Sequence, residues 1–259
     1  AMAHNKVKAS LKITVKKAPR SVSLRADRLT LGVGEVMALG AALPSGTAGG
    51  CWFESSNPGS AVIEGSAVRA VAPGKSTIAV WTYNWKKKTA TLTVLPAPEG
   101  VSLDRAELAL GVGDGATLKA ALTPGSAGAC EFTSDKPEIA KVDLKTGRVT
   151  AVSVGAAVVT VKTFNEKAAS CAVTVAPAPT KLSLSAPGGR GTIGLYEKMR
   201  LTPAIDPGSE ATFTYWSSNT RYVTVGADGT VYGRRVGSAT VYAMAHNKVK
   251  ASLKITVKK

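Results

Sequence analysis

A pattern that recurs about every 80 residues is the feature that most constrains how this chain folds. Leu24, Leu103 and Leu184 each open a copy of it, and they stand 79 and 81 residues apart. Internal repetition of this kind indicates an array of similar small units. Each copy continues with a glycine-rich turn, at Gly32-Val33-Gly34-Glu35, Gly111-Val112-Gly113-Asp114 and, in a broken form, Gly194-Leu195-Tyr196-Glu197.

The copies are made of short alternating segments, and none has helical periodicity. Each closes on alternating apolar and polar residues, at Thr91–Val94, Ala172–Val175 and Lys254–Val257. Strict alternation is typical of half-buried strands, and turn residues at short, regular intervals are typical of a β-sandwich. We therefore expect an all-β chain of three tandem immunoglobulin-like β-sandwich domains, at residues 20–95, 99–176 and 180–259.

The expected joins between these domains are short and rich in proline. They read Leu95-Pro96-Ala97-Pro98 and Ala176-Pro177-Ala178-Pro179. Proline-rich joins act as semi-rigid spacers. The expected arrangement is therefore an elongated rod.

A second repetition joins the two ends of the chain. Residues 1–17 and 243–259 are identical, so 1–17 is expected to be a terminal hairpin fragment that duplicates the end of the third domain. One interpretation is a parent protein that repeats a whole three-domain block; the alternative is an engineered duplication. The segment Lys16-Lys17-Ala18-Pro19 favours the first, because it supplies a proline-containing join after a third domain.

The net charge of +16 suggests binding to nucleic acid or another polyanion. However, the duplicated segment carries five lysines and no acid, so counting it once lowers the charge to +11. The remaining basic residues are dispersed along the expected strands, so we expect no nucleic-acid partner. No apolar run is long enough for a membrane helix and the start does not resemble a signal peptide, so we expect a mature or engineered fragment that is not membrane-embedded.

The repeated pattern resembles the bacterial Ig-like group 2 domain. The resemblance covers Ser21–Val257 and includes an opening leucine strand, the glycine turn, an apolar strand ending near proline, and a motif such as Tyr215-Trp216-Ser217-Ser218-Asn219. The sequence departs from the family at Phe53, Phe132 and Tyr215, where the usual residue is tryptophan. Such domains occur in intimin- and invasin-type adhesins, in wall-bound carbohydrate-active proteins and in phage virions. The resemblance implies spacing, display and binding on a bacterial cell surface, and no particular ligand.

Nothing in the sequence indicates catalysis, and we expect neither an enzyme nor a cofactor or metal. The histidines His4 and His246 are one position in two copies, and we expect a solvated side chain in a hairpin turn. No carboxylate pair of the glycosidase kind is evident. Gly188-Gly189-Arg190-Gly191 lacks the ending of a phosphate loop, so we expect an ordinary loop there.

The three cysteines, Cys51, Cys130 and Cys171, are too few for a disulfide framework and lack zinc-site spacing. We expect small buried apolar residues. A Cys130–Cys171 disulfide stays open as the alternative.

Outward-facing aromatic residues are the candidate binding feature. If Phe53 points inward, Trp52 points outward, and we expect Trp52, Trp81 and Tyr83 to form one face with Trp85 at its end. The third domain has a similar set in Trp216, Tyr242, Met244 and His246, whereas the second has mostly polar residues. Clustered exposed aromatic residues mark an interaction surface or are covered by neighbouring segments.

Two functions follow from these features. The first is a stiff spacer, or an adhesive or fibre-forming module, on a bacterial surface; the alternative is a module that binds host or cell-wall glycan, or a protein, through its aromatic faces. Self-association is expected through these faces or through residues 1–17. In that segment Leu11, Ile13 and Val15 alternate as in an edge strand, which predicts strand exchange with residues 243–259 of another molecule.

Overall fold

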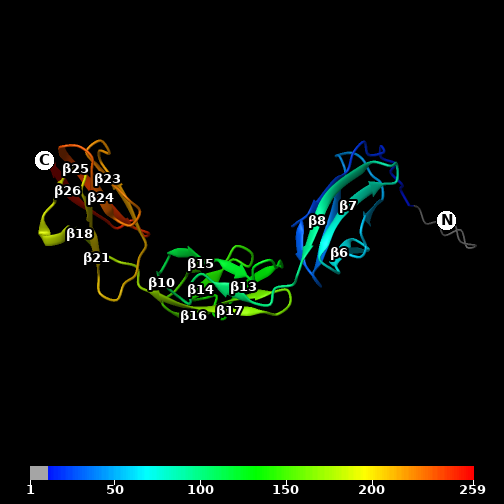
Figure 1. Ribbon diagram of the computed structural model, residues 1–259, viewed down its shortest axis with the longest axis horizontal. Helices are drawn as coiled ribbons and strands as arrows, with labels where there is room; N and C mark the ends of the chain where they lie inside the picture. The colour runs from blue at the N-terminus through cyan, green and yellow to red at the C-terminus, as the bar shows by residue number, and fades with distance from the viewer. Residues whose placement is uncertain (1–10) are drawn as a thin grey trace, which may run out of the picture. The chain divides into compact units, whose positions relative to one another are not determined.

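The computed structural model describes residues 11–259 (Figure 1). Their contacts divide the chain into two compact units, residues up to 99 with 122–129, and 100–121 with 130–259. The secondary structure is almost entirely strand, and the helical segment among the described residues is a single 3₁₀ turn at Pro187–Gly189. That turn lies in the glycine-rich segment expected to be a loop. The expected all-β fold is confirmed.

The first set of strands, here called sandwich 1, contains two four-stranded sheets. Their orders are β1-β3-β6-β5 and β2-β8-β7-β4. The strands are β1 (Ser23–Ala26), β2 (Thr30–Gly32), β3 (Val36–Ala42), β4 (Cys51–Ser55), β5 (Ala61–Glu64), β6 (Ala67–Ala70), β7 (Gly74–Thr82) and β8 (Lys87–Leu95).

Sandwich 2 follows with the sheets β10-β17-β16-β13 and β11-β15-β14 and the pair β12-β9. Its strands are β9 (Val101–Leu103), β10 (Glu107–Gly111), β11 (Gly115–Thr117), β12 (Ala120–Leu122), β13 (Cys130–Ser134), β14 (Ala140–Val142), β15 (Arg148–Ala151), β16 (Gly155–Thr163) and β17 (Ala168–Ala176).

Sandwich 3 repeats this plan with the sheets β19-β26-β25-β22 and β20-β24-β23 and the pair β18-β21. Its strands are β18 (Leu182–Ser185), β19 (Thr192–Gly194), β20 (Lys198–Arg200), β21 (Thr202–Ile205), β22 (Phe213–Ser217), β23 (Val223–Val225), β24 (Thr230–Gly233), β25 (Gly237–Ala245) and β26 (Lys250–Lys258).

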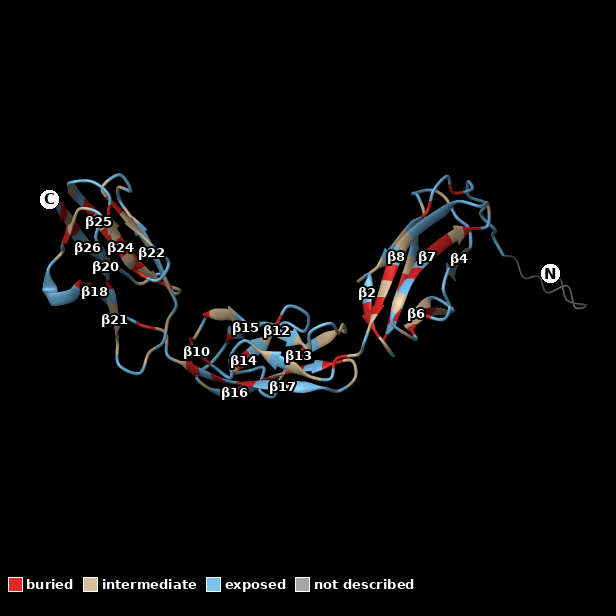
Figure 2. Ribbon diagram, in the orientation of Figure 1, coloured by how far each residue is buried: buried red, intermediate tan, exposed pale blue. Residues whose placement is uncertain are grey.

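Each sandwich encloses its own apolar core, as the alternation predicts (Figure 2). Along β26, Ile255 and Val257 are buried while Lys254 and Lys258 are exposed. The expected core aromatic residues Phe53, Phe132 and Tyr215 pack against the three cores. Burying apolar side chains stabilises a fold by about 25 cal/mol per Å², so these alternating faces are the main reason each sandwich forms.

The turn with the acid keeps one geometry in all three sandwiches. Its third residue is left-handed each time, with φ of 88° at Gly34, 85° at Gly113 and 68° at Tyr196. Glycine adopts this conformation without strain, and a tyrosine does so only where the surroundings hold it. Here Tyr196 N–H donates to Gly233 O at 2.7 Å. The third turn, expected to be broken, is therefore altered in sequence and intact in geometry.

The last strand of each sandwich is an interior strand. Strand β26 lies between β19, which runs parallel to it, and β25, which runs antiparallel. This bears on the duplicated segment, whose residues 1–10 lie outside the described residues. Within the described part, residues 11–16 form no strand, and Leu11, Ile13 and Val15 are exposed. An exchanging segment would thus have to replace an interior strand with partners on both sides.

Candidate interaction surfaces

Three indole rings form a cluster on the outer face of sandwich 1. Trp52 on β4 is the cross-strand partner of Trp81 on β7, and their rings are nearly parallel with centroids 6.4 Å apart. Trp85, in the turn after β7, stands edge-on to both at 5.9 and 6.1 Å. The turn gives Trp85 a φ of 62°, which directs its ring back over the strands. We call these three residues the tryptophan cluster.

Polar neighbours already occupy much of this cluster. Glu54 accepts hydrogen bonds from Trp81 Nε1 at 2.7 Å and Trp52 Nε1 at 3.3 Å. Lys87 Nζ lies 4.5 Å from the centroid of the Trp81 ring, a cation–π contact. Trp85 is the most open ring, with 73% of the residue exposed. An incoming ligand would therefore meet Trp85 first.

Tyr83 was expected to share a face with Trp52 and Trp81, but its ring lies outside the tryptophan cluster. A Cβ built on Gly49 would fall 2.3 Å from Cε1 of Tyr83, so this ring lies against the loop before β4. The ring that joins Trp52 and Trp81 is Trp85, because the left-handed turn folds it back.

The other two sandwiches differ at the same sites. In sandwich 3, Trp216 and Tyr242 stack at 5.1 Å, two cross-strand pairs along from the positions that Trp52 and Trp81 occupy in sandwich 1. The half-buried Met244 pairs with Thr214 at those equivalent positions. Sandwich 2 is polar there, and Lys162 forms an exposed ion pair with Glu166.

A buried carboxylate that sequence reasoning missed joins sandwich 2 to sandwich 3 within the second unit. Asp114, which is 5% exposed, accepts hydrogen bonds from Thr212 N and Thr212 Oγ1, both at 2.9 Å. Gly111 lies in the same contact, where a Cβ would come within 2.0 Å of Glu210 O. Thr212 is the residue directly before β22. We call this set of contacts the Asp114 joint.

His246 belongs to this joint, so the expectation of a solvated turn histidine is wrong. Its Nε2 lies 3.0 Å from Val112 O, a distance at which Nε2–H donates to the carbonyl. Its Nδ1 is buried 3.5 Å from Asp114 Oδ2 and has no hydrogen-bond partner. The hairpin between β25 and β26 carries the histidine into the joint, and only its neighbour Asn247 faces the linker, donating to Pro179 O at 2.7 Å.

The corresponding carboxylate of sandwich 1 makes a similar set of contacts within the first unit. Glu35 is 3% exposed and accepts from Gly32 N and from Ala129 N, both at 3.0 Å. Arg28 Nη2 also donates to it. Ala129 stands directly before β13, just as Thr212 stands directly before β22. We call these contacts the Glu35 joint.

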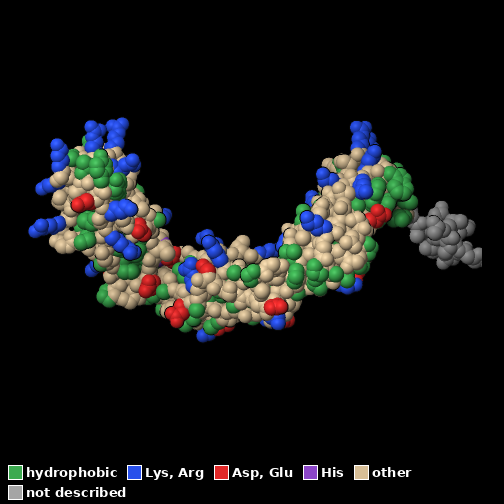
Figure 3. All heavy atoms as spheres, in the orientation of Figure 1, with side chains coloured by type: hydrophobic (Ala, Val, Ile, Leu, Met, Phe, Trp, Pro, Cys, Tyr) green, Lys and Arg blue, Asp and Glu red, His purple; other side chains and the backbone are tan. Residues whose placement is uncertain are grey.

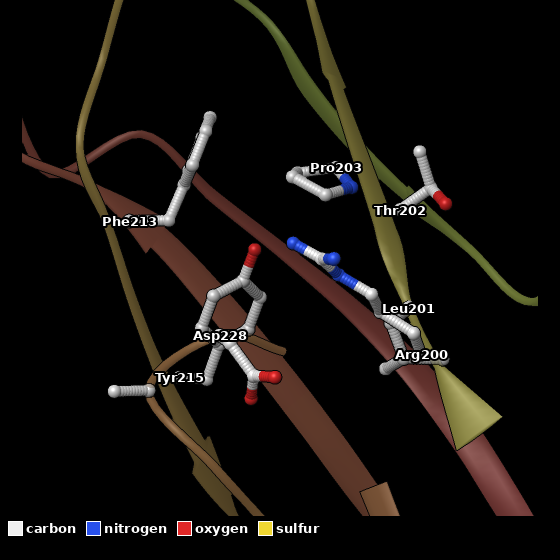
Figure 4. Close-up of a pocket in the computed structure, with 8 residues that line it drawn as sticks. Arg200, Leu201, Thr202, Pro203, Phe213, Tyr215 and Asp228 are labelled. Carbon is white, nitrogen blue, oxygen red and sulfur yellow. The ribbon is translucent and has the colours of Figure 1, made fainter. Parts of the chain in front are cut away.

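Sandwich 3 has a hollow of about 530 Å³ that the sequence did not predict. Figure 4 shows the Arg200 guanidinium and the Tyr215 hydroxyl pointing into it, with Phe213 and Pro203 alongside. The turn that borders it, Gly226–Gly229, is one residue shorter than Asp143–Gly147 of sandwich 2, where Leu144 O accepts from Phe132 N. Burial raises the pKa of Tyr215, and hydrogen bonds from Thr230 lower the pKa of Asp228.

Metal-ligand residues, cysteines, apolar helices and surface charge bear on the remaining expectations from the sequence. Among them, no three His, Cys, Asp or Glu side chains gather as metal ligands. Cys171 is a buried free thiol, so the alternative Cys130–Cys171 disulfide is not formed. No helix in the described part of the chain is long and apolar enough to cross a membrane. Figure 3 shows Lys and Arg side chains spread over all three sandwiches on the face drawn.

A family model identifies the class of protein that this fold defines. The bacterial Ig-like domain (group 2) matches residues 98–173 and 196–257, more than half of the chain. The chain belongs to this family and is a repeat module built from such domains.

Solved structures of surface proteins are similar in part. Domains 4–9 of the surface layer protein SbsC share 19% identity over 93% of this chain and 48% of that one, with a TM-score of 0.31. An intimin mutant of EHEC O157:H7 shares 24% identity over 29% of this chain and 44% of that one, with a TM-score of 0.24. The chain thus spans about half of the SbsC fragment. No curated protein matches the sequence.

Proposed function

We propose that this chain is a non-catalytic repeat segment of an extracellular bacterial surface protein, in which it serves as a stiff spacer and self-associating, fibre-forming or adhesive module. The observation that carries the proposal is the Asp114 joint. A spacer must resist bending between its domains, and a buried carboxylate with several donors resists it because opening the joint leaves polar groups without partners. The family, the proline-rich joins and the proposed division at residues 20–95, 99–176 and 180–259 support the same role.

Measuring how the sandwiches tumble tests the spacer role. We expect ¹⁵N relaxation of the whole chain to give one correlation time for the amides of sandwiches 2 and 3. Two clearly shorter correlation times in the unaltered protein would contradict a stiff spacer.

Self-association is proposed to use the duplicated segment. Leu11, Ile13 and Val15 are identical in sequence context to Leu253, Ile255 and Val257, so they fit the slot of β26 in another molecule. The exchange restores the same pairings and costs little at equilibrium, although releasing an interior strand makes it slow. Deleting residues 1–17 should abolish the associated species in sedimentation. An unchanged mass would count against the exchange.

The second candidate function is binding of a protein or a wall or host glycan to the aromatic surfaces. The tryptophan cluster favours it, because apolar rings that gather at the surface, here with Trp52 and Trp85 exposed, mark an interaction site. The contacts of Glu54 and Lys87 occupy both indole N–H groups of the strand pair and one ring, which favours a protein over a sugar.

Replacing Trp52 and Trp81 by alanine tests this candidate. We expect the double variant to lose binding to the protein or glycan that the unaltered chain binds, while its melting temperature stays the same. Binding that survives in a folded double variant would exclude the cluster as the contact, and a glycan array would separate sugar from protein.

A further inference from the structure

The acid of the third turn, Glu197, is placed like Glu35 and yet lacks a neighbour of the kind that Glu35 has. Both side chains accept from the first glycine of their turn through Oε2 at 3.0 Å, Gly32 N in one and Gly194 N in the other. Glu35 Oε1 then accepts Ala129 N. Among the described contacts, Glu197 Oε1 has no such donor, and Glu197 is exposed.

The donors in the two joints share one place in the fold. Ala129 N and Thr212 N belong to the residue directly before β13 and β22. The residue in that place in sandwich 1 is Gly50, directly before β4. Gly50 is exposed, and a Cβ built on it meets nothing within 4 Å. Sandwich 1 therefore presents a donor and sandwich 3 presents an acceptor, each placed as its counterpart is in the Glu35 and Asp114 joints.

The segment that enters sandwich 1 is also set as in the other joints. Ala48 N donates to Lys17 O at 3.2 Å, as Glu210 N donates to Pro177 O at 3.1 Å. Asn84 donates to Pro19 O, as Asn247 donates to Pro179 O. Lys17–Pro19 thus lies on sandwich 1 in the way that a linker from a preceding sandwich lies on sandwich 3.

The duplication determines which sandwich would precede sandwich 1. The residues before Ala18 are identical to those that end sandwich 3. We infer that Glu197 of one molecule accepts the Gly50 N–H of a second copy of this chain, so that sandwich 3 of the first docks end to end on sandwich 1 of the second. The inference rests on the proposed array role and names its partner and its contact.

The local chemistry agrees with this pairing. Tyr196, beside Glu197, is 68% exposed and stands at the position of Gly113 in the Asp114 joint, where a Cβ would meet nothing within 4 Å. Tyr83 of sandwich 1 stands at the hairpin position of His246, which reaches the acid of the preceding turn.

Titrating ¹⁵N-labelled whole chain with unlabelled chain tests the contact, with sedimentation giving the mass. We expect the Gly50 amide to shift downfield as association grows. Glu197→Ala should weaken association roughly tenfold or more, since a charged acceptor is lost. Gly50→Pro removes the N–H and should do the same.

Two control variants make the outcome specific. Gly50→Ala keeps the N–H and adds a Cβ, which Ala129 and Thr212 also carry, so it should associate like the unaltered chain. Glu138→Ala removes an exposed acid from sandwich 2 and should also change nothing. The inference is overturned if the chain does not associate, if Glu197→Ala leaves association unchanged, or if Gly50→Ala is as harmful as Gly50→Pro. Any of these results together with a rigid Asp114 joint would leave the spacer role standing.

Discussion

The Asp114 joint and the Glu35 joint make the same backbone hydrogen bond, but different side chains complete them. Both offer a buried carboxylate to the backbone N–H directly before a strand of the following sequence repeat. Asp114 takes its further contacts from across the joint, from the Thr212 hydroxyl and the His246 ring. Glu35 takes its further contact from Arg28 of its own sandwich. The backbone N–H donor is common to both joints, whereas the other groups around the carboxylate differ. A turn that ends in an acid can therefore be combined with different neighbouring side chains.

Replacing Asp114 should cause the largest loss of stability, because donors on both sides of the joint lose their acceptor. In Asp114→Ala, Thr212 N, Thr212 Oγ1 and Gly115 N lose their acceptor. Leaving buried donors unsatisfied costs about 1–3 kcal/mol each, and partial opening to water should limit the total to about 3 kcal/mol. Relaxation should show sandwiches 2 and 3 tumbling separately, and urea unfolding should report the loss. Sandwich 1 amides serve as the internal reference, and an unchanged correlation time would contradict the role of Asp114.

Adding one methyl group at Gly111 should have a smaller effect. The Cβ in Gly111→Ala would approach Glu210 O and the His246 ring, so the joint must open or shift, at a cost of about 2 kcal/mol. Gly194→Ala is the matched control, since the three atoms nearest to its Cβ belong to the flexible Glu197 side chain. We expect Gly111→Ala alone to separate the motions of sandwiches 2 and 3. Equal behaviour of the two variants would show that the close approach at Gly111 is unimportant.

Lowering the pH should have the smallest effect of the three changes, a loosening of the linker that precedes sandwich 3. The backbone N–H groups of Lys181 and Thr180 hold the pKa of Asp206 below its ordinary value of 3.8. A carboxyl group with a lowered folded-state pKa stabilises the fold above its unfolded-state pKa, and the effect disappears as pH falls through the lowered value. The protection factors of the Thr180 and Lys181 amides, which correct exchange for its intrinsic pH dependence, should therefore fall below about pH 4. Asp206→Asn should show the lowered protection already at neutral pH, and a protection factor that stays constant with pH in the unaltered chain would refute the link.

The repeated alternation was enough to predict the strands and their buried faces. Period-two patterns such as the one along β26 leave a single face that can be buried, and this holds whatever the neighbours are. Side chains in turns were less predictable. His246 and Tyr83 occupy equivalent hairpin positions, yet one is buried in a joint and the other lies on Gly49. Trp85 joins its cluster only because its turn is left-handed.

The sequence alone determined the family, the number of repeated patterns and the identity of the core residues, because local periodicity and glycine turns specify a β-sandwich without reference to distant residues. Only the tertiary structure showed why an acid ends each turn. The side chains of Glu35 and Asp114 act on N–H groups that lie 94 and 98 residues further along the chain. Sequence spacing carries no signal for such a contact, since it depends on how segments far apart in the chain meet in the folded molecule. That dependence on folded neighbours is also why the open acceptor at Glu197 becomes visible only beside its two occupied counterparts.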